Sequence, residues 1–312
     1  MAAAHEFYDV IIVGGGPAGL SAALVLARCR RRILVIDAGL PRNQAARELH
    51  GYLTRDCTPP AELLESGRRE IGRYGVEIRH DLVVEAECIA PSHDYAFPTL
   101  FLVRTKQGVA LRCRKLLFAT GITDTLPEIP GVVECYGTTV HHCPYCDGWE
   151  HRDQRLLAFG KNATAAAGLA LALRTWSAHV TVLGHGQTPA DHDMQRLARN
   201  GIDFRPERVV RLRHDGSQLR GAELDGDLFL PADALFFNTD CSTNLNVPQM
   251  LGCALSETGM ARTTAKQRSN IAGVFLAGDA DGEVQFSIVA AGEGATAAVT
   301  INRELQDEDR GD

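Results

Sequence analysis

Cys143 and Cys146 lie three positions apart in the sequence Cys-Pro-Tyr-Cys, and Asp147 follows them directly. Two cysteines at this spacing can close a small disulfide and exchange it with a dithiol. A neighbouring carboxylate can carry protons while thiolates form and leave. The pattern therefore predicts a redox-active disulfide, with Cys143, Cys146 and Asp147 as the candidate catalytic residues.

Two other interpretations of this pair stay open. Zinc could bind the two thiolates, with His141 and His142 just upstream, but a structural zinc site usually takes four ligands from two separated clusters. The sequence has no second Cys-x-x-Cys pair, so we predict no metal site. The thiols could also be inert and buried. The other seven cysteines are scattered singly, and we expect them to be small buried hydrophobic residues: Cys29, Cys57, Cys88, Cys113, Cys135, Cys241 and Cys253.

A glycine-rich turn lies near the start of the chain. Gly14, Gly16 and Gly19 follow the apolar run 8–13 and open an alanine- and leucine-rich stretch at 20–30. In a dinucleotide-binding turn the first glycine permits the tight turn, the second admits a pyrophosphate and the third packs helix against strand. Asp37 ends the next apolar run, where its carboxylate could accept hydrogen bonds from a ribose. A purely structural turn is the alternative.

Composition limits the class of protein. The 312 residues suggest two domains at about 150 residues each. The 45% hydrophobic and 23% charged composition excludes long disorder, and the net charge of −7 argues against nucleic-acid binding. No run of about 18 apolar residues occurs, and Met1–Tyr8 lacks the apolar core of a signal peptide. We therefore expect a cytoplasmic protein that does not bind membranes.

Strand and helix patterns alternate along the chain, which predicts an α/β protein with parallel sheets. A second strand, turn, helix and strand unit spans 155–183, about 145 residues after the first. Turn residues at 127–131 suggest a linker, and the charged tail at 306–312 is expected to fray. Expected strands are 8–13, 32–38, 76–90, 101–105, 115–120, 155–159, 179–183 and 270–279. Expected helices are 20–30, 59–74, a stretch that follows Gly160 and ends at 174, and 290–305.

Together these motifs resemble the low-molecular-weight thioredoxin reductases, FAD-dependent members of the pyridine-nucleotide disulfide oxidoreductases. The matching segments are VIIVGGGPAG near the start, FATG at 118–121, CPYCDG, GVFLAGD at 273–279 and 285–294. The resemblance implies two Rossmann-like nucleotide-binding domains of the three-layer ββα type, the second inserted in the first. The FAD-binding domain would comprise 1–124 and 247–312. The inserted domain, 125–246, would carry the redox disulfide and, in typical members, NADPH.

The resemblance also assigns roles to individual residues. Cys146 would lie nearer the flavin, Cys143 would react with the substrate disulfide or dithiol, and Asp147 would be the general acid and base. The N-terminus of the last helix, near 291–292, would face the flavin and stabilise its reduced form. The FAD-binding residues would be Gly14, Gly16, Pro17, Ala18, Gly19, Asp37, Ala38, Val83, Ala119, Thr120, Gly121, Gly278, Asp279, Gln285 and Phe286.

Some nearby residues depart from the family pattern or have two interpretations. Val284 stands where the family usually has an arginine before Gln285. His141 and His142 could tune the thiolates or act as bases, or be structural. Tyr145 and Trp149 could shape the substrate entrance or only pack, and Cys135 matches no family position and is expected to be structural.

The second nucleotide turn has lost three features of a nicotinamide site. Asn162 replaces the central glycine, so a side chain would crowd the phosphates. The segment 184–190 lacks the arginines that bind a 2′-phosphate, and Asp240 would face the pyrophosphate unfavourably. We expect no efficient NADPH use. The alternative is that binding persists through other residues, such as Lys161.

The function predicted from these observations is an FAD-dependent thiol/disulfide oxidoreductase without nicotinamide. It would be a dithiol oxidase that passes electrons to oxygen, as in members that close disulfides in small natural products, or a reductase fed by an electron-transfer protein. The alternatives are an NADPH-dependent thioredoxin reductase and a non-enzymatic flavin redox sensor. The expected partner is a thioredoxin-like protein or a small dithiol or disulfide, and family members are usually homodimers. The sequence does not identify the substrate.

Overall fold

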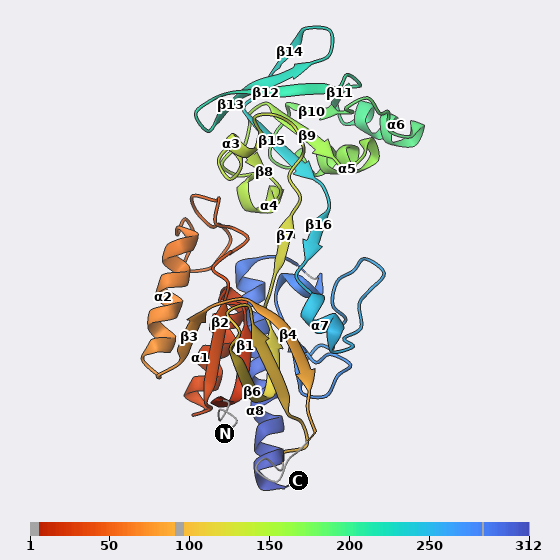
Figure 1. Cartoon of the computed structure of the whole chain (residues 1–312). Coiled ribbons are helices and arrows are strands. Elements are labelled where there is room, and N and C mark those ends of the chain that lie inside the picture. Colours follow the sequence, from red (N-terminus) through yellow and green to blue (C-terminus); the bar gives the residue numbers. More distant parts are fainter. Residues whose placement is uncertain (1–5, 91–96, 283, 312) are drawn as a thin grey trace.

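A computed structural model describes residues 6–90, 97–282 and 284–311. Figure 1 shows two lobes joined by two extended segments, β7 (Ile122–Asp124) and β16 (Cys241–Thr243). These strands pair antiparallel, with Asp124 opposite Cys241 and Ile122 opposite Thr243. The domain boundaries, 1–124 with 247–312 against 125–246, stay a prediction. Residues 1–5, which begin the segment expected not to be a signal peptide, lie outside the described residues.

The lower lobe is built on a seven-stranded sheet in the order β3-β2-β1-β6-β5-β4, with β17 also paired to β6. The strands β1, β2, β3, β6 and β17 run parallel, whereas β4, β5 and β6 are antiparallel neighbours. The bounds are β1 Glu6–Val13, β2 Ile33–Asp37, β3 Glu77–His80, β4 Val83–Cys88, β5 Phe101–Thr105, β6 Ala110–Phe118 and β17 Val274–Leu276.

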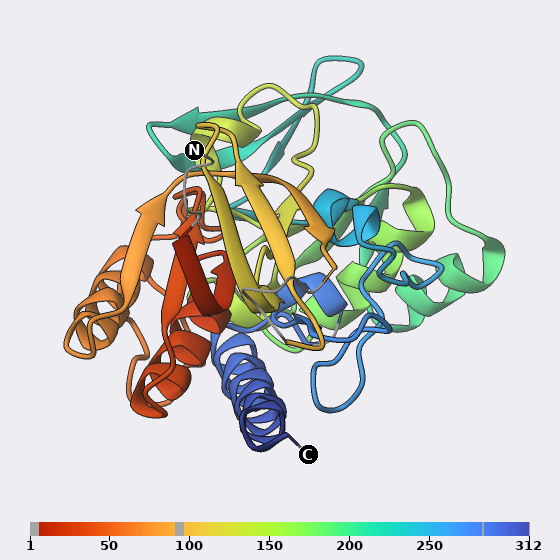
Figure 2. The same ribbon diagram turned by 60° about the horizontal axis from the view of Figure 1, so that its bottom comes forward.

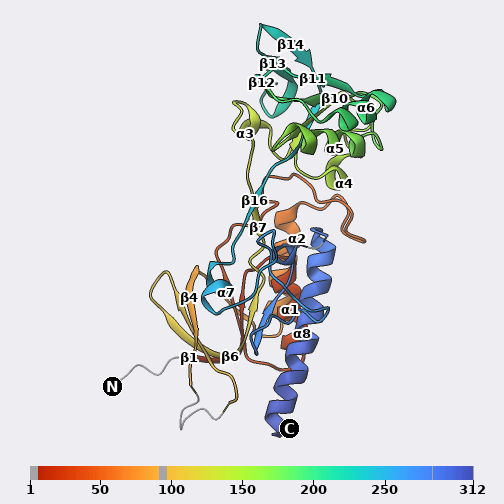
Figure 3. The ribbon, with the colours of Figure 1, turned by 90° about the vertical axis from the view of Figure 1, so that its right-hand side faces the viewer.

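Helices cover one face of this sheet, and the antiparallel strands fold over the other (Figure 3). The helices are α1 (Pro17–Arg28), α2 (Pro60–Gly72) and α8 (Ser287–Arg310). Side chains of β1 alternate between the two faces, as the strand period of two requires. Val10 and Ile12 pack under α1 and α8, while Ile11 and Val13 pack with β4 and β5. The sequence of β1 is therefore continuously apolar at 10–13, because both faces of the sheet are covered there.

Helices α1 and α8 lie together on one side of the sheet, as the view from the end of this lobe shows (Figure 2). A side chain at Gly294 in α8 would collide with the Ala18 carbonyl oxygen, 2.0 Å from the Cβ position. Glycine at 294 therefore lets α8 approach the first turn of α1. The C-terminal helix is thereby held against the glycine turn at residues 14–19.

The upper lobe contains a five-stranded parallel sheet in the order β11-β10-β9-β15-β8, and a separate antiparallel sheet, β12-β13-β14. The bounds are α3 Val132–Cys135, β8 Val140–His141, α4 Pro144–Asp147, β9 Leu156–Gly160, α5 Ala163–Leu173, β10 Val180–Leu183, α6 Asp191–Arg199, β11 Asp203–Arg205, β12 Val209–Asp215, β13 Gln218–Leu224, β14 Leu228–Pro231 and β15 Ala234–Asn238. The lower lobe adds α7 (Asn246–Met250) and a short 3-10 helix, Asp279–Asp281.

The α/β class and both strand, turn, helix and strand units are confirmed. The expected strand at 76–90 is two strands, β3 and β4, and the expected strand at 270–279 is only the three residues of β17. The residues at 127–131, expected to form the linker between domains, lie just after the connection. The segment that connects the two lobes at this point is β7. None of the sequence patterns indicated the antiparallel sheet at 209–231.

The expectation of a frayed tail was wrong, because α8 continues to Arg310. Buried Arg114 bonds Glu308 at 2.8 Å and Asp309 at 2.7 Å, and buried Lys115 lies 2.5 Å from Glu308. These two cations need carboxylate partners, since an unpaired buried charge is costly. The charged residues of the tail are therefore part of the fold.

The expectation for the single cysteines was wrong in part. Cys113, Cys135 and Cys253 are buried, as expected. Cys29, Cys57 and Cys88 are exposed, and Cys241 is half-buried on β16. Among the residues that the structure describes, no helix is both long and apolar enough to cross a bilayer.

Replacing Arg114 with methionine should destabilise the protein by about 3 kcal/mol, because Glu308 would lose one of its two buried cation partners and Asp309 would lose its bond to Arg114. The measurement is the free energy of unfolding of the purified protein in denaturant. Arg303→Met, at an exposed position of the same helix, is the matched control and should change it by less than about 0.5 kcal/mol. Equal stabilities for the two variants would contradict the role of the tail.

Candidate active site

A cavity of about 600 Å³ runs from the glycine turn of the lower lobe to the disulfide of the upper lobe. It contains fourteen of the fifteen predicted FAD-binding residues in its wall; the remaining one, Gly19, is packed behind the turn. Cys146, Asp147, His141 and His142 form part of the wall at the upper end. The structure thus brings the two predicted motifs to one cavity.

The three glycines of the first turn have different surroundings. A side chain at Gly14 would lie 2.2 Å from the Ala119 carbonyl oxygen, and one at Gly19 would lie 1.9 Å from the Gly14 carbonyl oxygen. Both positions therefore need glycine for close packing. A side chain at Gly16 would meet nothing within 4 Å, so glycine here leaves free space at the start of α1.

This free space has the properties of an anion site that FAD would fit. Gly16 caps α1 without a side-chain hydrogen bond, so the first amides of the helix face the cavity. The Thr120 hydroxyl is buried in the cavity wall with no partner in the described residues, and the same is true of Arg68 Nε. Arg68 also holds Asp37 at 3.3 Å, at the end of β2. Polar groups of this kind, on an apolar wall, fit a bound dinucleotide.

The last helix starts earlier than expected. It begins at Ser287 rather than near Ala290, so residues 291–292 lie in its second turn and not at its N-terminus. Ser287 and Ala290 line the cavity, together with Gln285 and Phe286. The part of α8 that faces the cavity is therefore its first turn, which starts at Ser287 directly after the cap residue Phe286.

Cys143 and Cys146 form a disulfide at the short helix α4. Cys143 caps this helix, and its sulfur accepts a hydrogen bond from the Cys146 amide at 3.2 Å. An amide that donates to a sulfur also stabilises the thiolate that forms when the disulfide opens. Cys146 lines the cavity, whereas Tyr145 between the two cysteines is 74% exposed.

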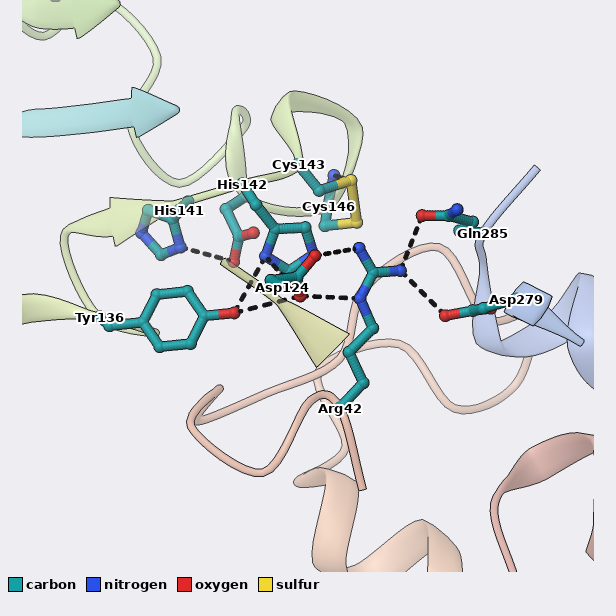
Figure 4. The surroundings of a disulfide bond; sticks show 10 residues. Arg42, Asp124, Tyr136, His141, His142, Cys143, Cys146, Asp279 and Gln285 are labelled. Atoms are coloured by element: carbon teal, nitrogen blue, oxygen red, sulfur yellow. Dashed lines mark hydrogen bonds and ion pairs between the residues drawn. A yellow bond between two sulfur atoms is a disulfide. The ribbon is translucent and has the colours of Figure 1, made fainter. Parts of the chain in front are cut away.

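Arg42 lies beneath the disulfide and connects several parts of the site (Figure 4). Its guanidinium donates two hydrogen bonds to Asp124, at 2.6 and 2.8 Å. It also donates to Asp279 at 2.9 Å and to Gln285 at 2.8 Å. Burial would raise the pKa of Asp124, but the bonds and charge of Arg42 outweigh it and hold that pKa below its usual range. Arg42 places a guanidinium beside Gln285, where Val284 replaces the arginine usual in the family.

His142 and Tyr136 form the other side of this cluster (Figure 4). The Tyr136 hydroxyl lies 3.2 Å from His142 Nδ1 and 3.5 Å from Asp124. Burial lowers the pKa of His142, and the charge of Asp124 does not fully offset it. His142 is therefore kept neutral near pH 7, as a group that can accept a proton. His141 instead points to Asp147, with 3.2 Å between Nδ1 and Oδ1.

The second nucleotide turn is closed by its own side chains. Asn162 accepts a hydrogen bond from the Ala165 amide at 2.8 Å, and Gln187 accepts one from the Ala163 amide at 3.3 Å. Lys161 and Asp240 form an ion pair at 2.9 Å. The helix N-terminal amides that would hold a pyrophosphate therefore already have acceptors.

Sequence reasoning missed several residues of these sites. The segment 184–190 has no arginine, but Arg208 from a later loop lies against it, with its Cγ 3.3 Å from the Cβ position of Gly186. Arg42, Arg68, Tyr136 and His151 were also missed. Arg68 lies within α2, and the other three lie in loops or next to a short element. None has a local sequence pattern that indicates a role.

The fold and the site define a class of protein: a two-lobed oxidoreductase with a dinucleotide cavity that reaches a Cys-x-x-Cys disulfide. The model of the pyridine nucleotide-disulphide oxidoreductase family matches residues 8–294. The chain belongs to this family, and its fold is of the thioredoxin reductase type. It is an FAD-dependent disulfide oxidoreductase.

Individual relatives support this assignment. The solved structure of HlmI is 36% identical, with a TM-score of 0.93, over 97% of this chain and 94% of that one. Thioredoxin reductase tcpT of Claviceps purpurea is 29% identical over 284 residues, 87% of this chain and 86% of the relative. The protein of Arthroderma benhamiae named "Probable thioredoxin reductase" is 39% identical over 154 residues, which cover 49% of this chain but only 38% of that relative.

Asp124→Asn should reduce the free energy of unfolding of the flavin-loaded protein by about 3 kcal/mol at pH 7, because Arg42 would lose its bidentate partner. Since the folded protein lowers the pKa of Asp124, the pair contributes fully above the unfolded value of about 3.9. The difference from the native protein should be constant between about pH 7 and 5 and shrink below about pH 4. Unfolding measured across this range tests it. The exposed Asp203→Asn variant is the control, and a pH-independent difference for Asp124→Asn would contradict the prediction.

Proposed function

We propose that this protein is a nicotinamide-independent dithiol oxidase: a substrate dithiol reduces the Cys143–Cys146 disulfide, and the electrons pass to FAD and then to oxygen. The observation that carries the proposal is the self-capped start of α5. The two nucleotide turns of the chain can be compared directly, because both follow a parallel strand and open a helix.

The two turns differ in what occupies the first amides of the helix. At α1 the cap is Gly16, and the amides of the first helical turn face the large cavity without a side-chain acceptor. At α5 the cap is Asn162, whose side chain bonds the Ala165 amide, while Gln187 bonds the Ala163 amide. A dinucleotide at α5 would have to displace both acceptors and separate Lys161 from Asp240. This competition supports weak nicotinamide binding.

The residues of the lower lobe would hold FAD. The α1 turn would bind the pyrophosphate, Asp37 the ribose, and Thr120, Asp279 and Gln285 would bond the rest of the molecule. Bound FAD supplies an acceptor for the electron pair that two thiols give up on forming a disulfide. Asp147 would accept and return protons as the thiolates form. His142, kept neutral by burial, lies on the same wall as a second proton acceptor.

The surroundings of the disulfide favour a small substrate dithiol. Tyr145 and Trp149 are 74% and 65% exposed on either side of Cys146. Exposed aromatic side chains next to a reactive site offer flat apolar contacts to a small molecule. A thioredoxin-like protein is the other substrate class, and either one would deliver two thiols to the same disulfide. A homodimer is the associated proposal for assembly, and it rests on the family resemblance. A cytoplasmic location stays the expectation drawn from the sequence.

The second candidate function is an NADPH-dependent thioredoxin reductase. Arg208 favours it, because this cation lies against the turn at 184–186, where family members bind the 2′-phosphate. The positive charge that binds the 2′-phosphate would then come from Arg208 in a later loop instead of from an arginine within 184–190.

The two functions are separated by an anaerobic titration of the flavin absorbance near 450 nm. We expect that NADPH and NADH leave the absorbance unchanged and that dithiothreitol bleaches it, because only the disulfide route is open. Stoichiometric bleaching by NADPH within seconds would overturn the proposal in favour of the reductase.

Opening the second turn should strengthen nicotinamide binding. The double change Asn162→Gly and Gln187→Ala removes both side-chain acceptors and frees the amides of Ala163 and Ala165. Two freed amides should tighten NADPH binding by about 10-fold, as measured by calorimetry. Gln218→Ala, at the exposed first residue of β13, is the control. Unchanged affinity in the double variant would show that the self-capped helix is not the obstacle.

Three substitutions test the disulfide chemistry. Cys143→Ser and Cys146→Ser should each abolish turnover with dithiols and give different flavin spectra, because only Cys146 lines the cavity. Asp147→Asn should slow bleaching by dithiothreitol by roughly 10²–10⁴-fold, the usual contribution of a general acid or base. Full turnover in both cysteine variants would exclude the disulfide mechanism, and an unchanged rate would remove Asp147 from it.

A further inference from the structure

A row of buried polar side chains leads from Asp147 into the interior of the upper lobe. Asp147 Oδ1 lies 3.2 Å from His141 Nδ1. His141 Nε2 lies 3.0 Å from His151 Nε2, and His151 Nδ1 lies 2.9 Å from Gln154 Oε1. Both histidines are less than 10% exposed and pack against Phe236.

The two ends of this row open into different cavities. Asp147 and His141 line the large cavity at the disulfide. His151 and Gln154 line a second cavity of about 560 Å³, together with Thr139, Arg155 and Asp233. Arg155 and Asp233 form a half-exposed ion pair at 2.6 Å at this second cavity, so its surface is polar. The row is thus continuous between the reactive disulfide and a polar outer surface.

The hydrogen-bond roles along the row leave one place for a mobile proton. With Gln154 Oε1 as acceptor, His151 Nδ1–H donates to it and His151 Nε2 is free to accept. His141 Nε2–H then donates to His151. His141 Nδ1, which lies 3.2 Å from Asp147 Oδ1, is then without a proton. A proton on Asp147 can therefore pass to His141 Nδ1 while the Nε2 proton passes to His151.

We propose that Asp147, His141 and His151 form a proton relay that carries the thiol proton of the substrate from the active site to the second cavity. This inference rests on the proposed function, because that function requires thiol deprotonation at the disulfide. His141 and His151 act through Asp147 and are positioning and proton-carrying residues.

The step balances as a thiol–disulfide exchange. A substrate S–H bond breaks, and its sulfur forms a bond to Cys143 while the Cys143–Cys146 bond breaks. Cys146 leaves as a thiolate with the electron pair of that bond, and Asp147 accepts the proton. The relay removes this proton and returns Asp147 to the carboxylate for the second thiol.

The surroundings of His151 suit a group that passes a proton on. Burial lowers its pKa, although Gln154, Asp147 and Glu150 act in the opposite direction and His141 acts with the burial. Phe236 is the uncharged neighbour that packs against the ring. A proton that reaches His151 is therefore not held there, and it leaves on the side of the second cavity.

The test replaces His151 by phenylalanine, which keeps an aromatic ring against Phe236 and removes both nitrogens. The anaerobic bleaching of the holoprotein by dithiothreitol should slow by about 10-fold or more, less than for loss of Asp147 itself. Proton release, followed with a pH indicator, should slow equally, and the solvent deuterium isotope effect should increase. His179→Phe, at an exposed histidine of this lobe, is the control and should match the native protein.

Rescue distinguishes a relay from a structural role. His151→Ala leaves space beside the second cavity, and added imidazole should restore its rate in a concentration-dependent way. An unchanged rate and isotope effect in folded, flavin-loaded His151→Phe would overturn the relay. A slower rate with no change in isotope effect and no recovery with imidazole would also overturn it. If dithiols fail to bleach the native protein, it is the proposed function that fails.

Discussion

The two carboxylates Asp124 and Asp279 can lie close together only because the guanidinium of Arg42 lies between them. Asp124 ends the strand that leads into the upper lobe, and Asp279 belongs to the predicted flavin site. One half-buried cation therefore connects the cofactor cavity to the strand that leads into the upper lobe. Losing it would leave two half-buried negative charges facing each other, which is far more costly than losing an exposed ion pair.

The chain uses the same supersecondary unit twice, and the two units differ in how the start of the helix is capped. A parallel strand, a glycine turn and an alanine-rich helix occur at β1–α1 and again at β9–α5. The helix start stays free in the first unit, where Gly16 is the cap, and is occupied in the second, where Asn162 and Gln187 accept from its amides. The fold tolerates both, because the cap only has to satisfy the same few amides. Nucleotide binding can therefore be lost without loss of the architecture.

The sequence predicted the elements better than the site. The motif at 14–19 and the apolar runs around it determine local geometry, so the first unit could be placed to within a few residues. Arg42 could not be found in this way, because its partners at 124, 279 and 285 are distant in sequence and it lies in a loop without periodicity.

The histidines show the same limit. His141 attracted attention because it precedes Cys143, whereas His151 had no such marker. Their contact exists because the loop after α4 returns beside β8 and β15. The prediction that the tail at 306–312 frays was wrong for a related reason. A run of charged residues is usually solvated, and this one packs only because Arg114 and Lys115 on β6 lie where Glu308 can pair with them.

The pairing of β7 with β16 has a consequence for how such proteins can be rearranged. The chain leaves the lower lobe at Asp124 and comes back at Cys241, its direct partner in the ladder. The two ends of the intervening segment are thus one strand spacing apart, about 5 Å. A turn of two residues bridges that distance in an ordinary hairpin. The upper lobe is therefore an insertion whose two ends lie side by side. Gene rearrangement can remove or exchange this insertion without interrupting any strand of the seven-stranded sheet of the lower lobe.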